Sequence, residues 1–294
     1  MTRPMSSAPR LAVIADIHGS MPSLEAALHE IQDYLVDGIL VAGDMTCGPY
    51  SGEVLRRLQG ENCQMVLGNN EEYLLRFDLG DAPDWWHTSH QWAFTRWVYE
   101  HMDRASLDLL HSLPRQRVID MPGTAPIRLF HGSPQDANEH LYPGFNPGAL
   151  TRTFSETSEA VLICGHSHMP WQVRQEDRLA FNPGAIFFAE NGDPGAQYAL
   201  LTWEAGRWEV EHHSVPYDCA LVRADYQESG LLAAGGTFAL ACLDSLETGR
   251  NLVVELLTYA WKMSKEAGYG NDEYIRDEIW DRAGNSFDWE GKGF

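Results

Sequence analysis

Aspartate and histidine side chains follow a short apolar segment near the start of this chain. Asp16 and His18 come directly after Leu11–Ile14, a branched, wholly apolar run typical of a strand buried on both faces. Their spacing of two residues places both side chains on the same side of a strand. A carboxylate beside an imidazole offers hard oxygen and nitrogen ligands, which suit a metal ion. The D-x-H pattern is common by chance, so further residues must support this interpretation.

Four more apolar segments end in the same way, most of them beside a glycine. Segments 38–42, 63–67, 127–130 and 161–164 each lead into Asp, Asn or His. In open α/β sheets the ligand site lies beyond the carboxyl ends of the strands, so these side chains should meet there. Coordination would also relieve the cost of burying polar groups. We therefore predict two metal ions that share one bridging carboxylate, with ligands from Asp16, His18, Asp44, Asn69, His131, His166 and His168.

The order of apolar patterns predicts an α/β fold. Helical spacing over 21–34 between two buried strands indicates a right-handed βαβ unit, and most of 71–114 is helical in pattern. Residues 117–120 and 127–130 flank a Pro/Gly turn and predict a hairpin. Short strands follow at 171–174, 179–182, 198–203 and 208–212. We predict a four-layer α-β-β-α sandwich, with two mixed sheets packed face to face and helices outside.

The aromatic residues between 71 and 114 allow two interpretations. The tryptophans in this section could form a lid over a substrate: Trp85, Trp86, Trp92 and Trp97. Phe94, Trp97 and Val98 instead have helical spacing, which favours a helix packed on the sheet. We prefer the packed helix, and we interpret the histidines that lack a strand-end position as surface or packing residues: His87, His90, His101 and His111.

Composition narrows the range of partners. A formal net charge of −21 argues against a nucleic-acid polymer or an anionic membrane surface as partner. No apolar run approaches the length that a bilayer requires, and Met1–Arg10 shows no signal-peptide pattern, so we expect a cytoplasmic protein. Five scattered cysteines without a C-x-x-C pair indicate neither a disulfide framework nor a zinc ribbon.

Taken together, the motifs resemble those of the calcineurin-like metallophosphoesterases, which are D-x-H, GD, GN[HD], H and GH-x-H in this order. The closer resemblance is to the YfcE-like prokaryotic branch, through Gly43-Asp44 followed by Gly48-Pro49, His131-Gly132-Ser133-Pro134, and Phe181-Asn182-Pro183-Gly184-Ala185. The resemblance covers roughly residues 10–230. We therefore expect a metallophosphoesterase domain at 1–230 and a C-terminal helical extension at 231–294 that packs on the same domain.

This resemblance implies a division of the ligands between two ions. One ion would be held by Asp16, His18, Asp44 and His168, and the other by Asp44, Asn69, His131 and His166, with Asp44 as the bridge. The ions would be divalent transition metals, with Mn²⁺ as the first candidate and Fe, Zn²⁺ or Ni²⁺ as alternatives. A metal-bridging hydroxide would hydrolyse phosphate mono- or diesters of small molecules or nucleotides.

Two departures from the family pattern bear on the substrate. Asn70 occupies the place where many members have His, and asparagine is no general acid near neutral pH, although it can donate a hydrogen bond to phosphate. We predict that Asn69 and Asn70 contact the substrate. Protein Ser/Thr phosphatases and symmetrical diadenosine tetraphosphatases carry Arg shortly after GD, where this chain has Met45-Thr46-Cys47-Gly48-Pro49, so we disfavour both.

Two alternatives to an efficient enzyme stay open at this point. Some family relatives have lost turnover and serve as scaffolds in protein assemblies, although such relatives usually lack some ligands and this chain keeps all of them. A regulatory protein that binds a nucleotide with little hydrolysis would accommodate Asn70.

Replacement of Asp44 by Ala should lower metal affinity and turnover together, because the change removes a ligand from both ions. Asp193, in the Gly192-Asp193-Pro194 turn, is the matched control. The measurements are metal content and hydrolysis rate for both variants. A near-normal Asp44→Ala protein beside an inactive Asp193→Ala protein would show that the site lies elsewhere.

Overall fold

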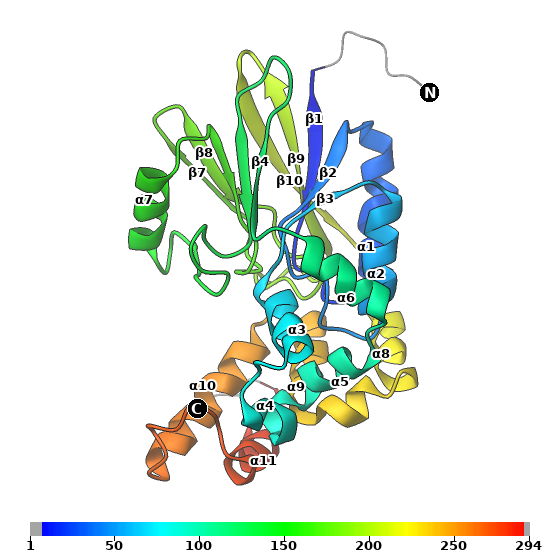
Figure 1. The fold of residues 1–294 in the computed structure, drawn as a ribbon, viewed down its shortest axis with the longest axis vertical. Helices are drawn as coiled ribbons and strands as arrows, with labels where there is room; N and C mark the ends of the chain where they lie inside the picture. The colour runs from blue at the N-terminus through cyan, green and yellow to red at the C-terminus, as the bar shows by residue number, and fades with distance from the viewer. Residues whose placement is uncertain (1–7, 291–294) are drawn as a thin grey trace.

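The computed structural model describes residues 8–290 and contains two five-stranded sheets packed face to face (Figure 1). The first sheet has the order β10-β9-β1-β2-β3. Its strands β1 (Arg10–Ile14), β2 (Gly38–Val41) and β3 (Gln64–Met65) are parallel, whereas β9 (Ala196–Glu204) and β10 (Arg207–Val215) pair antiparallel. The sheet is mixed, as predicted, although β3 is shorter than the apolar run that predicted it.

The second sheet repeats this arrangement and has the order β4-β5-β6-β8-β7. β4 (Gln116–Ile119) and β5 (Ile127–Phe130) form the predicted hairpin. β6 (Val161–Ile163) and β8 (Arg178–Asn182) continue parallel to β5, and β7 (Trp171–Gln175) pairs antiparallel with β8. Each sheet thus has three adjacent parallel strands, whose carboxyl ends lie at one edge.

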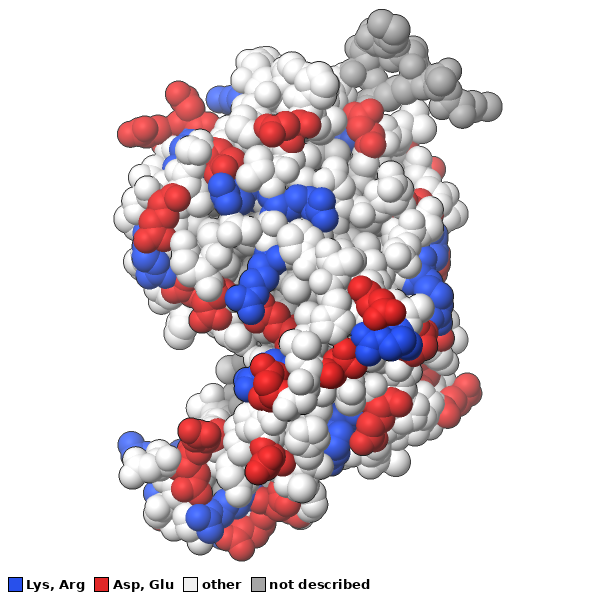
Figure 2. Space-filling view, in the orientation of Figure 1, with Lys and Arg blue, Asp and Glu red and all other residues white. Residues whose placement is uncertain are grey.

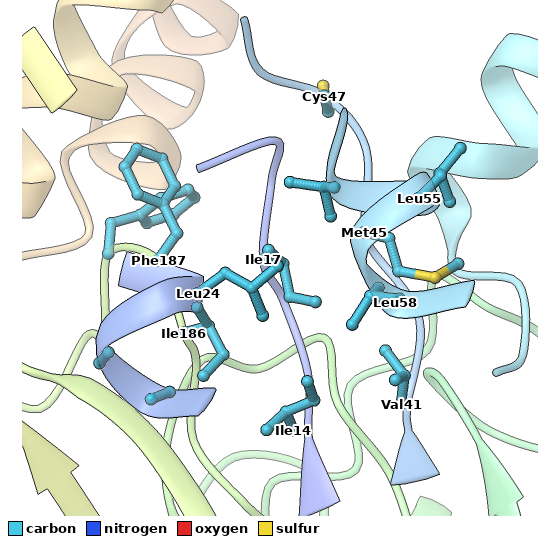
Figure 3. Close-up of a cluster of buried hydrophobic side chains, with 14 of the residues drawn as sticks. Ile14, Ile17, Leu24, Val41, Met45, Cys47, Leu55, Leu58, Ile186 and Phe187 are labelled. Atoms are coloured by element: carbon cyan, nitrogen blue, oxygen red, sulfur yellow. The ribbon is translucent and has the colours of Figure 1, made fainter. Parts of the chain in front are cut away.

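Alternating side chains of β1 separate two cores. Leu11 and Val13 belong to the core between the sheets, whereas Ala12 and Ile14 belong to the core beneath helices. The covering helices are α1 (Met21–Ile31), which ends in a 3-10 turn (Gln32–Tyr34), and α2 (Ser51–Gly60). Figure 3 shows this helical core, with Ile17 at its centre.

One helix covers the outer face of the second sheet. Leu150 and Phe154 of α7 (Pro147–Glu156) pack on Phe130 and Leu162 of the strands. Burial of such a side chain contributes about 1.5–3 kcal/mol to the free energy of unfolding. The layers are therefore helix, sheet, sheet, helix, and the predicted α/β sandwich is confirmed.

The stretch of chain that connects β3 to β4 is helical, as predicted, but its packing differs from the prediction. Its elements are α3 (Asn69–Leu79), α4 (Asp84–Thr88), a 3-10 turn (His90–Trp92), α5 (Ala93–His101) and α6 (Arg104–Ser112). Phe94 and Val98 are buried, yet α5 packs against α3 and the C-terminal helix α9 (Leu231–Thr248) rather than lying on the sheet. An apolar stripe specifies that a helix is buried but does not specify its partner.

The C-terminal helices lie below the sheets in Figure 1. They are α8 (Cys219–Glu228), α9, α10 (Leu252–Glu266) and α11 (Asp277–Ser286). Helix α9 is apolar on two sides: Leu243 belongs to the core around α1 and α2, whereas Ala241 packs with Trp280 of α11. The domain division at residue 230 stays a prediction.

Two further expectations concern the termini and the chain as a whole. The absence of a signal pattern in Met1–Arg10 concerns mostly residues 1–7, which lie outside the described part of the chain. Within residues 8–290, none of the helices combines the length and the apolar character needed to cross a bilayer. All five cysteines are free.

Candidate metal centre

The predicted ligands converge where the parallel strands of both sheets end. Two groups form, in each of which the ligand atoms lie within 4.8 Å of one another: Asp16, His18 and His168, and Asp44, His131 and His166. In the first group, Nε2 of His168 lies 3.2 Å from Nε2 of His18 and 3.6 Å from Oδ1 of Asp16. In the second, Nε2 of His131 lies 3.4 Å from Oδ2 of Asp44.

Asp44 and Asn69 complete the arrangement. Oδ2 of Asp44 lies 3.8 Å from Nε2 of His18, so the same carboxylate oxygen faces both groups. Oδ1 of Asn69 lies 3.0 Å from Nε2 of His131. The structure therefore brings together all seven side chains that the sequence singles out, and it places Asp44 between the two groups, where a bridging ligand belongs.

The backbone at these positions is held in an unusual conformation. Five non-glycine residues of the centre have φ between 47° and 68°, in the left-handed region: Asp16, His18, Asp44, His166 and His168. Each such residue costs roughly 1–3 kcal/mol and persists only when its surroundings enforce it. Gly43, at φ 86°, also needs to be glycine, because a Cβ there would lie 2.7 Å from Nδ1 of His131. The fold thus holds the ligands in place at the expense of local strain.

Backbone carbonyls set the tautomers of three histidines. Nδ1 of His131 donates to the carbonyl of Ala42 at 2.7 Å, and Nδ1 of His168 donates to the carbonyl of Phe188 at 3.1 Å. Because a carbonyl only accepts, Nε2 of each neutral ring carries the lone pair. Nε2 of His166 likewise donates to the carbonyl of Asn138 at 3.1 Å, which leaves Nδ1 as its ligand atom. Metal-binding histidines are commonly oriented in this way.

Burial shifts the titration of the imidazoles towards the neutral form. It lowers the pKa of His18 to about 4 and that of His166 to about 3, and it lowers the pKa of His168 well below its usual value. Burial alone would also lower the pKa of His131, but the charges of Asp44 and Asp16 raise it to about 10. Neutral rings are the form in which histidine binds a metal, so three of the rings are ready to coordinate and His131 would release a proton on binding.

The two aspartates repel each other in this buried place. Burial, together with the charge of Asp44, raises the pKa of Asp16 to about 8. Burial would also raise the pKa of Asp44, but the adjacent His131 and His18 lower it below its usual range. Bound cations would offset this concentration of negative charge. The donor set of carboxylates, neutral imidazoles and one amide oxygen therefore fits two divalent transition-metal ions.

A family match agrees with this geometry. Residues 10–206 match the calcineurin-like phosphoesterase superfamily domain. The chain belongs to this family. The family prediction is confirmed, whereas the narrower resemblance to the YfcE-like branch stays a prediction. The matched segment ends before α8, so helices α8 to α11 lie beyond it.

Individual relatives support the family assignment. The uncharacterized protein MJ0912 of Methanocaldococcus jannaschii is 26% identical over 189 residues, which are 62% of this chain and 71% of the relative. A metallophosphoesterase from Sphaerobacter thermophilus superposes with a TM-score of 0.63 at 26% identity and covers 78% of this chain and 99% of its own. Serine/threonine-protein phosphatase 2 of Escherichia coli is 32% identical over 108 residues, 35% of this chain and 49% of that protein.

Sequence reasoning missed a buried carboxylate that supports the centre. Glu71 in the first turn of α3 accepts hydrogen bonds from the amides of Asp44 (2.9 Å), Thr46 (2.8 Å) and Gly68 (2.7 Å), and from the Thr46 hydroxyl (2.7 Å). It thereby ties the loop after β2 to the loop after β3. Burial and the charge of Asp44 raise the pKa of Glu71. In the sequence it looks like an ordinary acidic residue near a helix N-terminus.

Asn182 supports the loop after β6 in the same way. Its amide group donates to the carbonyl of Gly165 at 2.6 Å and to the hydroxyl of Ser167 at 3.1 Å. This residue ends β8, the third parallel strand of the second sheet, and is buried. Its position in the Asn-Pro-Gly motif was the only sequence signal for this role.

A cavity of about 380 Å³ opens over the centre, with His18, Asp44 and His168 in its wall. Asn70 faces it, as expected of a substrate contact. His140 also lines it, with its ring centroid 4.2 Å from that of His166. This histidine was missed, because it lies in an irregular loop with no strand before it.

The histidines and aromatic residues between positions 71 and 114 lie partly at the surface and partly at the cavity. Nδ1 of His90 lies 2.8 Å from Asp281 at the surface, and the His101 ring stacks on Trp97, which agrees with their interpretation as surface and packing residues. Trp92 and Phe94 do line the cavity. Both rings also pack on aromatic neighbours, Trp92 on Trp86 and Phe94 on Phe238, so packing is confirmed and a role of these rings at the substrate site is left to the proposals below.

Replacement of Glu71 by Ala should destabilise the metal-free protein by about 3 kcal/mol or more, because three buried amides would lose their acceptor. The measurement is the free energy of unfolding from denaturant titration in the presence of a chelator. Glu72→Ala is the matched control, since Glu72 pairs with the exposed Arg115 instead. Equal stability of the two variants would contradict the role given to Glu71.

Proposed function

We propose that this protein is a dinuclear metal-dependent phosphoesterase that hydrolyses phosphate mono- or diesters of small molecules. The observation that carries the proposal is the placement of Asp44 between two groups of buried ligands at the wall of a cavity. A cavity of about 380 Å³ is of the size that takes a small molecule. The family match supports the reaction class.

In this proposal, Asp16, His18 and His168 hold one ion, and Asn69, His131 and His166 hold the other, with Asp44 shared. Mn²⁺ is the first candidate, and Fe, Zn²⁺ or Ni²⁺ also suit the donors. When bound, two such ions withdraw charge from the phosphoryl oxygens and activate water as a nucleophile.

The chain's own groups orient these ligands and hold the substrate. The Asn70 side-chain amide donates to Oδ2 of Asp44 at 2.6 Å, and its backbone amide donates to Oδ1 at 3.0 Å, so Asn70 fixes the plane of the shared carboxylate. We propose that Asn69 and Asn70 also contact the phosphoryl group. The tautomers set by the carbonyls of Ala42 and Phe188 keep the ligand nitrogens of His131 and His168 ready for coordination.

Charge supports a small substrate rather than a nucleic-acid polymer. Among the described residues on the face shown in Figure 2, basic side chains stand among acidic ones and form no continuous patch. Binding of a polyanion requires clustered Lys and Arg. The net charge of −21 also argues against a nucleic-acid polymer as the substrate.

Two other functions, a protein phosphatase and a non-catalytic scaffold, receive less support. The likeness to the bacterial protein phosphatase covers about half of that protein, and this chain lacks the Arg that such enzymes carry after GD. A scaffold without turnover would not need the complete ligand set, which this chain retains. We therefore favour catalysis over assembly.

Chelator-free protein reloaded with Mn²⁺ should contain close to two transition ions per chain and hydrolyse bis-p-nitrophenyl phosphate. EDTA should abolish the activity, because the neutral imidazoles and carboxylates alone provide no activated water. Elemental analysis and release of p-nitrophenol measure the two quantities. Persistent absence of bound metal would eliminate the proposed reaction.

The rate should depend steeply on the acidity of the leaving group, because Asn70 cannot protonate it. Aryl esters should react far faster than alkyl esters of similar size. Asn70→His should raise the rate on alkyl esters more than on aryl esters, by at most the general-acid factor of about 10²–10⁴. The measurement is kcat/KM against leaving-group pKa for both proteins.

A flat dependence in the unmodified enzyme would contradict this prediction. It would show that another side chain already donates the proton. His140 is then the residue to replace, because it lines the cavity, whereas His90 and His101 do not.

A further inference from the structure

The cavity over the metal centre has a wall that lies outside the family domain. Val253, Val254 and Leu257 of α10 line it, together with Phe238 of α9. All four follow residue 206, where the family match ends. In Figure 2 the molecule is hollowed between the part that contains the sheets and these C-terminal helices. The C-terminal helices therefore take part in shaping the space that a substrate enters.

This wall is tied directly to the metal centre. Asn251 caps α10 by accepting from the Val254 amide at 2.9 Å, and its side chain also bonds the carboxyl group of Glu190. The backbone amide of Glu190 in turn donates to the carbonyl of His168 at 3.1 Å. A second link joins Gly192 to Gly249 at 3.2 Å, just before α10. The start of α10 is thus held at a defined place relative to a predicted ligand.

Aromatic side chains of the central helical section also line the cavity. Trp92 and Phe94 line it, and Trp92 is held in place by stacking on Trp86 with ring centroids 3.6 Å apart. A lining that combines these rings with the aliphatic Leu257 and Val253 favours a flat or apolar group in the cavity. Phe188 adds another ring near the ligands, with its centroid 4.3 Å from that of His168.

The lining of the cavity disfavours a second phosphate on the substrate. Among the described residues, neither Lys nor Arg lines it, whereas Asp44 and Glu190 do. Metal ions at the centre would neutralise one phosphoryl group. A further phosphate on the same substrate would find neutral polar and apolar side chains there but no basic counter-charge, which is unfavourable.

We propose that the C-terminal helices select the substrate: an ester with a single phosphoryl group whose other part is uncharged and apolar, preferably aromatic. The apolar part contacts Trp92 and Leu257, and polyphosphates are rejected. This inference rests on the proposed function for the phosphoryl end of the substrate.

Binding of phosphonates to the Mn²⁺-loaded full chain tests the inference without turnover. Calorimetry compares methylphosphonate, 1-naphthylmethylphosphonate and 2-sulfoethylphosphonate. The naphthyl compound should bind on the order of tenfold or more tightly than the methyl compound, and the sulfonate, with its second anion, should bind most weakly. Leu257→Ala should remove most of the naphthyl preference and leave methylphosphonate affinity unchanged.

A charge variant tests the same wall independently. Val254 is 47% exposed, so Val254→Lys should fold and should strengthen binding of the sulfonate relative to methylphosphonate. Leu221→Lys is the matched control, because Leu221 is 54% exposed on α8 and does not line the cavity. Thermal melting verifies that each variant is folded.

The outcomes separate this inference from the proposed function. Equal affinity for the methyl and naphthyl compounds, or tighter binding of the sulfonate by the unmodified protein, would overturn the substrate inference alone. A loss of methylphosphonate and naphthyl affinity in equal measure in Leu257→Ala would do the same. Failure to bind any phosphonate, together with absence of metal-dependent hydrolysis, would overturn both.

Discussion

The concentration of buried carboxylates at one point is the constraint on which the rest of the structure depends. Asp16, Asp44 and Glu71 are all buried, and burial together with the charge of Asp44 raises the pKa of Asp16 and Glu71. In an unfolded chain these carboxylates would move apart into water. The Asp44 carbonyl prevents this by accepting from the amides of Ile17 (2.7 Å) and His18 (3.0 Å). Packed sheets and helices then hold the left-handed backbone in place, so the core stabilises a local arrangement that is unfavourable on its own.

The ligands were predictable because each is marked locally. A buried strand that ends in Asp or His carries its own signal, and the parallel order of strands brings such ends together. Glu71 carries no such mark, since its partners are backbone amides of two loops that the sequence does not place side by side. His140 was missed for the same reason. The α/β sandwich followed from the order of apolar runs, whereas the partner of α5 did not, because many apolar faces are equivalent before the chain is folded.

The C-terminal helices illustrate the same limit on a larger scale. The sequence predicted a helical extension in this region, but not that Val253, Val254 and Leu257 of α10 would line the cavity over the predicted metal centre. Their position depends on α9, which is apolar on two sides and lies between two cores. A helix of this kind acts as a spacer between the part that contains the sheets and the outer helices. Under the proposed function, different parts of one chain would encode specificity and catalysis.

The distance along the chain between ligands has a consequence for the order of folding. His18 and His168 are separated by 150 residues, yet their rings meet. Contacts of such long range form late, because the entropy of closing a large loop must be overcome first. Neither half of the chain holds a complete set of ligands, so high-affinity metal uptake must follow the docking of the two sheets. Metal that binds only this docked state shifts the equilibrium towards it and away from partly folded chains.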